Sequence, residues 1–185
     1  MVAPCRFTWG CGTGGSNLLF LVEDSADDAV LSKRAISKSG VHCDVNHVSH
    51  GGEALAMLLA PDGPIPDLIV LDFHLPQYNG LEILRALRAS ARTRHVPIVM
   101  LSALESDEEI QQCLAEGANS CVQKPVESES YTECVALIVR YWLTVDKRPE
   151  PAQSQRPHSP KVSAHFPTVS ATGAPLRFRA SLGSQ

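Results

Sequence analysis

The stretch that decides the fold is LIVLDFHLPQYNG, residues 68–80. It opens with four apolar residues, reaches an acid at Asp72, and passes through Pro76 and Asn79-Gly80 before a helical pattern begins. A short, wholly apolar run followed by a turn and a helix is typical of a strand that is buried on both faces of a parallel sheet. The sequence therefore predicts a central strand at 68–71, a loop that starts at Asp72, and a helix at about 81–89.

The same alternation of strand and helix patterns extends in both directions from this stretch. Further strands are predicted at 18–22, 43–48, 98–101 and 120–122. Further helices are predicted from a cap at Ser25 or Asp27 to Gly40, at 52–59, from about Ser106 to Gly117, and at 128–145. The runs at 18–22 and 98–101 are apolar and belong in the centre, whereas the other two strands are shorter or more polar and belong at the edges. With right-handed crossovers, this indicates the α/β, flavodoxin-like doubly wound (βα)5 fold, with a parallel sheet of order 2-1-3-4-5.

Composition divides the chain into three parts. Residues 1–16 are rich in Gly and are expected to form a flexible N-terminal arm, residues 17–148 form the folded domain, and the Pro- and Ser-rich residues 149–185 are expected to be disordered. No apolar run approaches the roughly 20 residues of a membrane span, and the start lacks the pattern of a signal peptide. The six cysteines form no CxxC pair, which favours reduced thiols. We therefore expect a cytoplasmic protein that does not contact a membrane.

Charge argues against one class of partner. The body at 17–148 holds 11 Lys and Arg against 19 Asp and Glu, so it is acidic. Proteins that bind nucleic acid mainly through phosphates need a basic surface. We expect no nucleic-acid partner.

Chemically active residues follow the ends of four predicted strands: Glu23 and Asp24, Asp72, Ser102, and Lys124. The carboxyl ends of parallel strands meet at one edge of a sheet, which is where ligands bind in such folds. Three carboxylates in one place call for a cation, and oxygen ligands favour Mg²⁺. An Asp carboxylate can attack phosphorus, while an ammonium and a hydroxyl stabilise the phosphoryl oxygens. The set predicts a phosphoryl-transfer site.

These stretches resemble the signature segments of bacterial response regulator receiver domains: LVEDS at 21–25, VLDFHLP at 70–76, MLSA at 100–103 and QKP at 123–125. The resemblance implies that Asp72 is the phosphoacceptor and that Ser102 and Lys124 contact the phosphoryl group. It also implies that Mg²⁺ is bound by Asp24, by Asp72, by Glu23 through water, and by the backbone carbonyl of His74. A cis bond before Pro125 is implied as well.

A narrower resemblance is carried by VEDSADD at 22–28 and by YWLTV at 141–145 followed by KRP. These segments are similar to small single-domain regulators that serve phytochrome-type histidine kinases. The implied protein is a stand-alone receiver in a two-component phosphorelay that signals by protein contact. Its implied partners are a sensor histidine kinase, with a bacteriophytochrome as the candidate, and a second copy. The two copies would pair through the region of the fourth and fifth helices with Tyr141 and Trp142. It would be no enzyme beyond assisting its own phosphorylation and dephosphorylation.

Other interpretations stay open at the level of sequence. The chain could act as a phosphate sink or relay, or as a receiver-like binding module that no longer responds to phosphate. An aspartyl phosphatase is disfavoured because His74 stands where a second carboxylate is usual. Cys121 occupies the position where receivers usually carry Tyr or Phe, so the aromatic readout is in doubt. The histidines at 42, 47 and 50 are expected to be solvated.

Overall fold

The computed structural model describes residues 16–103 and 107–146. They form a five-stranded parallel sheet of order β2-β1-β3-β4-β5, as predicted. The strands are β1 (Asn17–Val22), β2 (Cys43–Val48), β3 (Leu68–Asp72), β4 (Ile98–Ser102) and β5 (Ser120–Gln123). The helices are α1 (Ala26–Lys38), α2 (Gly51–Leu59), α3 (Gly80–Ala89), α4 (Asp107–Ala115) and α5 (Ser128–Arg140), which continues into the π-helical turn η1 (Tyr141–Val145). The predicted arm and tail lie outside the described residues, Ser16 apart.

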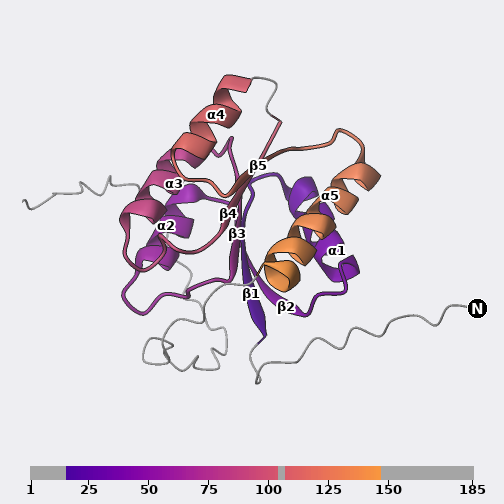
Figure 1. Cartoon of the computed structure of the whole chain (residues 1–185), viewed down its shortest axis with the longest axis horizontal. Helices are drawn as coiled ribbons and strands as arrows, with labels where there is room; N and C mark the ends of the chain where they lie inside the picture. Colours follow the sequence, from indigo (N-terminus) through magenta and orange to yellow (C-terminus); the bar gives the residue numbers. More distant parts are fainter. Residues whose placement is uncertain (1–15, 104–106, 147–185) are drawn as a thin grey trace, which may run out of the picture. The chain divides into compact units, whose positions relative to one another are not determined.

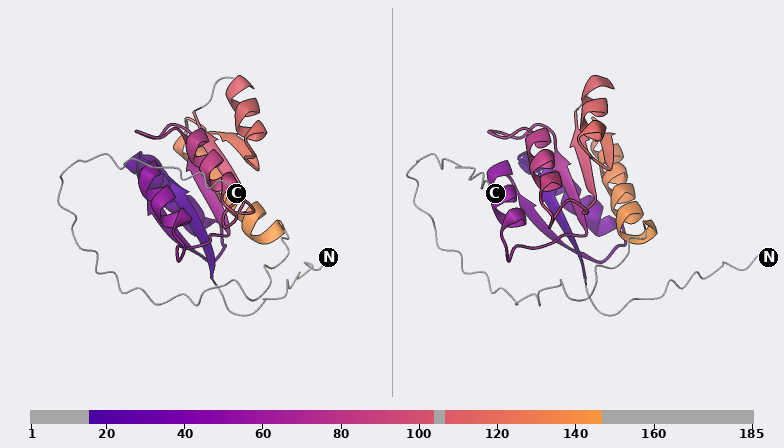
Figure 2. Two further views of the ribbon diagram at one scale, coloured as in Figure 1. Left: turned by 90° about the vertical axis from the view of Figure 1, so that its left-hand side faces the viewer. Right: turned by 60° about the vertical axis from the view of Figure 1, so that its left-hand side comes forward.

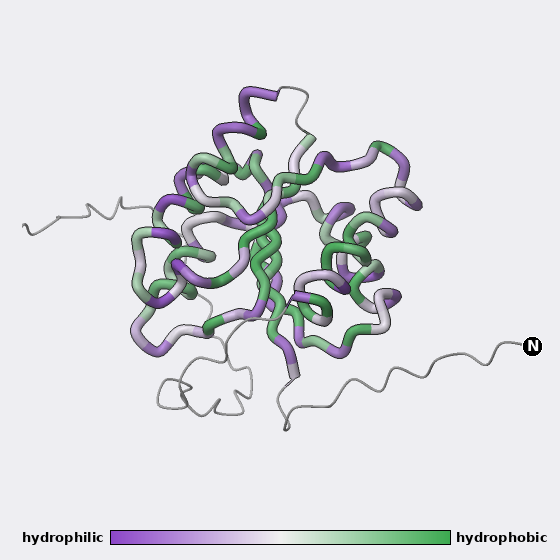
Figure 3. Tube along the Cα trace, in the orientation of Figure 1, coloured by the Kyte–Doolittle hydropathy of each residue, from purple (hydrophilic) through white to green (hydrophobic). Residues whose placement is uncertain are grey.

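Helices cover both faces of the sheet. Figure 1 and Figure 2 show α1 and α5 on one face and α2, α3 and α4 on the other. The central strands are mostly apolar along their length (Figure 3), since alternate residues point into the two cores. One core contains Phe20, Ile69 and Met100, and the other contains Leu19 and Val70, all at most 1% exposed. Burial of each such side chain stabilises the fold by roughly 1.5–3 kcal/mol.

The loop after Asp72 is held by its junction with α3. Asn79 caps this helix through a capping box with Glu82, and the amide of Gly80 donates to the carbonyl of Phe73 at 2.9 Å. A Cβ on Gly80 would lie 2.6 Å from the carbonyl oxygen of Asp72 and 2.8 Å from Cα of Phe73. Only glycine permits this close approach, so Gly80 helps to set the backbone that carries Asp72.

One expectation is wrong. The described residues contain no cis peptide bond, so the bond between Lys124 and Pro125 is trans. Trans is the intrinsically favoured form even before proline, and the Lys124 side chain reaches its partners with it. Other differences are small: α2 and α3 each start one residue earlier than predicted, and the cap expected at Ser106 lies outside the described residues. No helix in the described ranges has the length and apolar character that a bilayer span requires.

Candidate functional site

The predicted site residues do meet at the carboxyl edge of the sheet. Glu23 directly follows β1, Asp72 and Ser102 are the last residues of β3 and β4, and Lys124 follows β5. Backbone hydrogen bonds extend beyond the strands: the amide of Glu23 donates to Val48 at 3.1 Å and that of Lys124 to Ser102 at 2.7 Å. These bonds hold the rim residues at the edge where the strands end.

Lys124 lies at the centre of the site. Its ammonium Nζ is 2.7 Å from Oε2 of Glu23, 2.8 Å from Oδ2 of Asp72 and 3.0 Å from Oδ2 of Asp28. The side chains of Glu23, Asp72 and Lys124 are only 1%, 8% and 11% exposed. An ammonium has three N–H donors, and here each of the three can point at a different carboxylate.

Asp28 is the member of this cluster that sequence reasoning missed. It lies in the first turn of α1, where its backbone amide donates to the hydroxyl of Ser25, the N-cap, at 3.2 Å. Acids in a first helical turn are usually explained by the helix dipole. No local signal distinguishes it from Asp27, because both acids lie in the same first turn.

The carboxylates form a group that could hold a divalent cation. One oxygen each from Glu23, Asp24 and Asp72 lie within 4.8 Å of one another, and no other such group of three is found in the described part of the chain. Asp24 is exposed, and together with residues 73–79 it lines a shallow depression that gives access to the group. Three carboxylates contact a single ammonium and that of Asp24 lies beside them, so acids outnumber the one cation of the site. Hard oxygen donors and negative charge fit Mg²⁺.

His74 and Ser102 lie on the other side of Asp72. The amide of His74 donates to Oδ1 of Asp72 at 3.1 Å, and its ring Nδ1 is 3.4 Å from the fully buried hydroxyl of Ser102. The ring also packs edge-on against Phe73. Asp72 therefore accepts hydrogen bonds on both oxygens, one from the loop and one from Lys124.

Burial perturbs the charges of the site. Desolvation raises the pKa of the Glu23 carboxyl from 4.5 to about 7; the hydrogen bond from Lys124 opposes this rise and the charge of Asp72 adds to it. Burial alone would lower the pKa of the Lys124 ammonium, but its hydrogen bonds to Asp72 and Glu23 raise that pKa above its usual value. Lys124 therefore stays charged, while Glu23 titrates near neutrality in the absence of a cation.

The raised pKa of Glu23 predicts a pH dependence of stability. Between pH 4.5 and 7 the folded chain keeps a proton on Glu23 that the unfolded chain has lost. The folded state binds more protons, so the free energy of unfolding falls as the pH rises through this window, by at most about 3 kcal/mol. The test is urea unfolding without divalent ions at several pH values in this window, which gives the difference in free energy of unfolding between wild type and Glu23→Gln. A difference that stays constant across the window would contradict the prediction.

The histidines of the β2 region are not all solvated as expected. Nε2 of His47 lies 2.9 Å from the carbonyl oxygen of Glu23, and its Nδ1 lies 3.1 Å from Nζ of Lys33. A lysine ammonium only donates, so Nδ1 accepts and the Nε2–H group donates to the carbonyl. His47 thus ties the end of β1 to α1.

Cys121 is a partly buried residue whose role is packing. It packs against the core cluster that contains Cys113 of α4. Burial, with the contact to Cys113, raises the pKa of the Cys121 thiol to about 12. A protonated thiol is a poor nucleophile, which argues against a reactive role.

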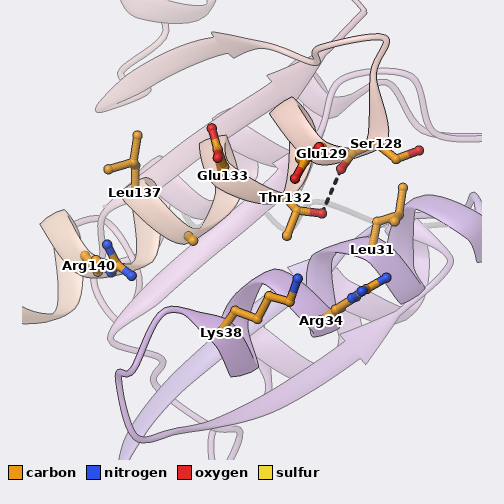
Figure 4. Close-up of a pocket in the computed structure, with 10 residues that line it drawn as sticks. Leu31, Arg34, Lys38, Ser128, Glu129, Thr132, Glu133, Leu137 and Arg140 are labelled. Atoms are coloured by element: carbon orange, nitrogen blue, oxygen red, sulfur yellow. Dashed lines mark hydrogen bonds between the residues drawn. The ribbon is translucent and has the colours of Figure 1, made fainter.

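A groove between α1 and α5 lies apart from this set of residues. Figure 4 shows Arg34 and Lys38 of α1 facing Glu129 and Glu133 of α5 across it, with Leu31 and Leu137 among its walls. None of the strand-end residues lines it. It offers mixed charge and some apolar surface.

Fold and site together define a class of doubly wound α/β domain: a parallel 2-1-3-4-5 sheet with an acidic cluster and a lysine at its carboxyl edge. The chain belongs to the response regulator receiver domain family, whose model matches residues 19–136.

Its relatives fall within the same family. A probable methanogenesis regulatory protein, FilR2 of Methanothrix harundinacea, is 31% identical over 73% of this chain and 89% of its own length. The phosphorylated cyanobacterial phytochrome response regulator RcpA is 28% identical over 74% of this chain and 100% of its own, with a TM-score of 0.69. The bacteriophytochrome response regulator RtBRR is 30% identical over 76% of this chain and 86% of its own length, with a TM-score of 0.59. The narrower resemblance to phytochrome-associated regulators is thereby confirmed.

Proposed function

We propose that this chain is a receiver of a two-component phosphorelay that accepts a phosphoryl group from a histidine kinase on Asp72. The observation that carries the proposal is the contact of Lys124 Nζ with Asp72 Oδ2 at 2.8 Å, inside the cation-binding group. The Asp72 carboxylate, held beside an ammonium and directly before the loop that lines a depression, supports a role as the nucleophile toward phosphorus. The output would pass by protein contact.

The chemistry requires two steps. First, a carboxylate oxygen of Asp72 attacks the phosphorus of a phosphohistidine; the new P–O bond forms as the P–N bond breaks, and the leaving imidazole takes up a proton. Lys124 would stabilise one phosphoryl oxygen and the Ser102 hydroxyl would donate to another. Second, a water molecule attacks phosphorus, the P–O bond to Asp72 breaks, and inorganic phosphate and the carboxylate are released. The protein would assist both steps and is proposed to have no other enzymatic activity.

Mg²⁺ is the cofactor that this site is proposed to take. Glu23, Asp24 and Asp72 would hold it, with the backbone carbonyl of His74 as a further ligand. When bound, it would neutralise charge that develops on the phosphoryl oxygens. The four surrounding carboxylates supply the negative charge that such an ion needs.

The proposed kinase is of the phytochrome type. The similarity to RcpA and RtBRR supports this choice, because both are regulators of phytochrome systems. The test is phosphotransfer from purified, autophosphorylated kinases, with a bacteriophytochrome kinase first. Transfer of label to wild type and not to Asp72→Asn is expected. Transfer from none of the kinases, combined with no reaction with acetyl phosphate and Mg²⁺, would favour the receiver-like binding module. Rapid loss of the transferred phosphoryl group without a downstream partner would favour the sink or relay.

We further propose that the chain forms a homodimer through α5 and η1. Leu137, Tyr141 and Val145 follow one another at intervals of four residues and are 62%, 51% and 62% exposed, so they form one apolar stripe. Trp142, also predicted to join this surface, is partly buried and packs against the core. Tyr141→Ser should weaken dimerisation about tenfold or more by light scattering, because aromatic anchors dominate interfaces. Val30→Ser on α1 is the matched control, and equal effects of both would contradict this interface.

A further inference from the structure

We propose that Asp28 is a positioning residue of the phosphoryl site, which fixes the ammonium of Lys124 so that one N–H remains aimed at the incoming phosphoryl group. The inference rests on the proposed function and adds a residue to it. Asp28 enters from α1, an element that supplies no other direct partner of Lys124, and its Oδ2 lies 3.0 Å from Nζ.

The Lys124 ammonium uses all three of its N–H donors within the site. Its three donors point at Glu23, Asp72 and Asp28. Once Asp72 becomes an acyl phosphate, the negative charge lies on the phosphoryl oxygens and no longer on the carboxylate, and the N–H that faced the carboxylate is free to bind one of these oxygens. Glu23 and Asp28 then hold the other two N–H groups. A lysine side chain has four flexible bonds, so two fixed anchors restrict the rotation of its head far more than one does.

The anchor itself is held in place. The Asp28 backbone belongs to the capped first turn of α1, and its amide donates to the Ser25 hydroxyl. Its side chain is 34% exposed while that of Lys124 is 11% exposed, so Asp28 lies at the rim and closes the solvent side of the lysine. Removal of its carboxylate would leave one ammonium donor to water.

Asp27 provides a control that distinguishes the loss of this specific contact from a general loss of negative charge. Asp27 precedes Asp28 in the same helical turn, is exposed, and lies outside the contacts that Lys124 makes. Asp27→Asn and Asp28→Asn remove the same charge from the same turn, but only Asp28→Asn replaces a charged partner of Lys124 by a neutral, weaker acceptor.

The test compares wild type, Asp28→Asn, Asp28→Glu and Asp27→Asn in the full chain. Phosphorylation by acetyl phosphate at saturating Mg²⁺ is followed by intact mass. We expect Asp28→Asn to react about tenfold more slowly, Asp27→Asn to react like wild type, and Asp28→Glu to recover part of the rate. Equal rates for Asp28→Asn and Asp27→Asn, whether slowed or not, would overturn the proposal.

A second measurement does not depend on phosphotransfer. The rate at which a mild acylating reagent labels the Lys124 amine, quantified by peptide mass spectrometry, reports how well the ammonium is held. Asp28→Asn should raise this rate severalfold and Asp27→Asn should leave it unchanged; an unchanged rate in Asp28→Asn would overturn the positioning role. If wild type takes no phosphoryl group while the labelling rates still differ as expected, the proposed function fails and the anchoring of Lys124 stands. Thermal unfolding of all four proteins controls for folding.

Discussion

Asp72→Asn is expected to reduce phosphoryl acceptance by at least about a thousandfold, because the amide lacks the nucleophilic oxygen that would form the new bond. The fold should survive. The substitution removes one of four carboxylates around a single ammonium, so relief of repulsion offsets the lost ion pair with Lys124. We expect the free energy of unfolding to change by no more than about 1 kcal/mol.

Intact mass after incubation with acetyl phosphate and Mg²⁺ measures the first effect, and urea unfolding measures the second. Asp62→Asn, an exposed acid in the connection before β3, is the matched control and should be phosphorylated like wild type. A mass gain of one phosphoryl group in Asp72→Asn equal to that of wild type would show that another residue is the acceptor.

Lys124→Met is expected to cause the largest loss of stability among the site variants. It leaves Glu23 and Asp72, which are 1% and 8% exposed, without their shared cation. Removal of one partner from a buried ion pair typically costs about 3–5 kcal/mol. Since a divalent ion can replace part of the lost positive charge, Mg²⁺ should recover more stability in Lys124→Met than in wild type.

Urea unfolding with and without Mg²⁺ tests this account, with Lys38→Met on the exposed part of α1 as the control. The control should lose little stability and respond to Mg²⁺ like wild type. Equal stability of Lys124→Met and wild type without Mg²⁺ would mean that the cluster does not depend on its ammonium.

The sequence predicted the sheet order and most of the site because both depend on local patterns that are easy to recognise. Apolar runs mark the central strands, and the residue after each run must lie at the carboxyl edge. Glu23, Asp72, Ser102 and Lys124 could all be placed in this way. Their convergence needed no knowledge of side-chain conformation.

What the sequence could not predict depends on how elements rotate and pack. Whether Asp27 or Asp28 faces the edge of the sheet depends on the rotation of α1 about its axis, which the local pattern leaves open. The sequence predicts that His47, on an edge strand, is solvated, but the packing of α1 places Lys33 beside it. The partial burial of Trp142 likewise depends on the helical turn η1, which continues α5 and lets Trp142 pack against the core.

The most direct test of the central claim is to trap the acyl phosphate. Wild type is phosphorylated with acetyl phosphate and Mg²⁺ and then reduced with borohydride, which converts an aspartyl phosphate into homoserine, and the peptides are sequenced by mass spectrometry. Homoserine is expected at position 72, and its formation should require Mg²⁺ during the phosphorylation step. Homoserine at another acid, or phosphate retained on Ser102 or a histidine with position 72 unchanged, would contradict the central claim.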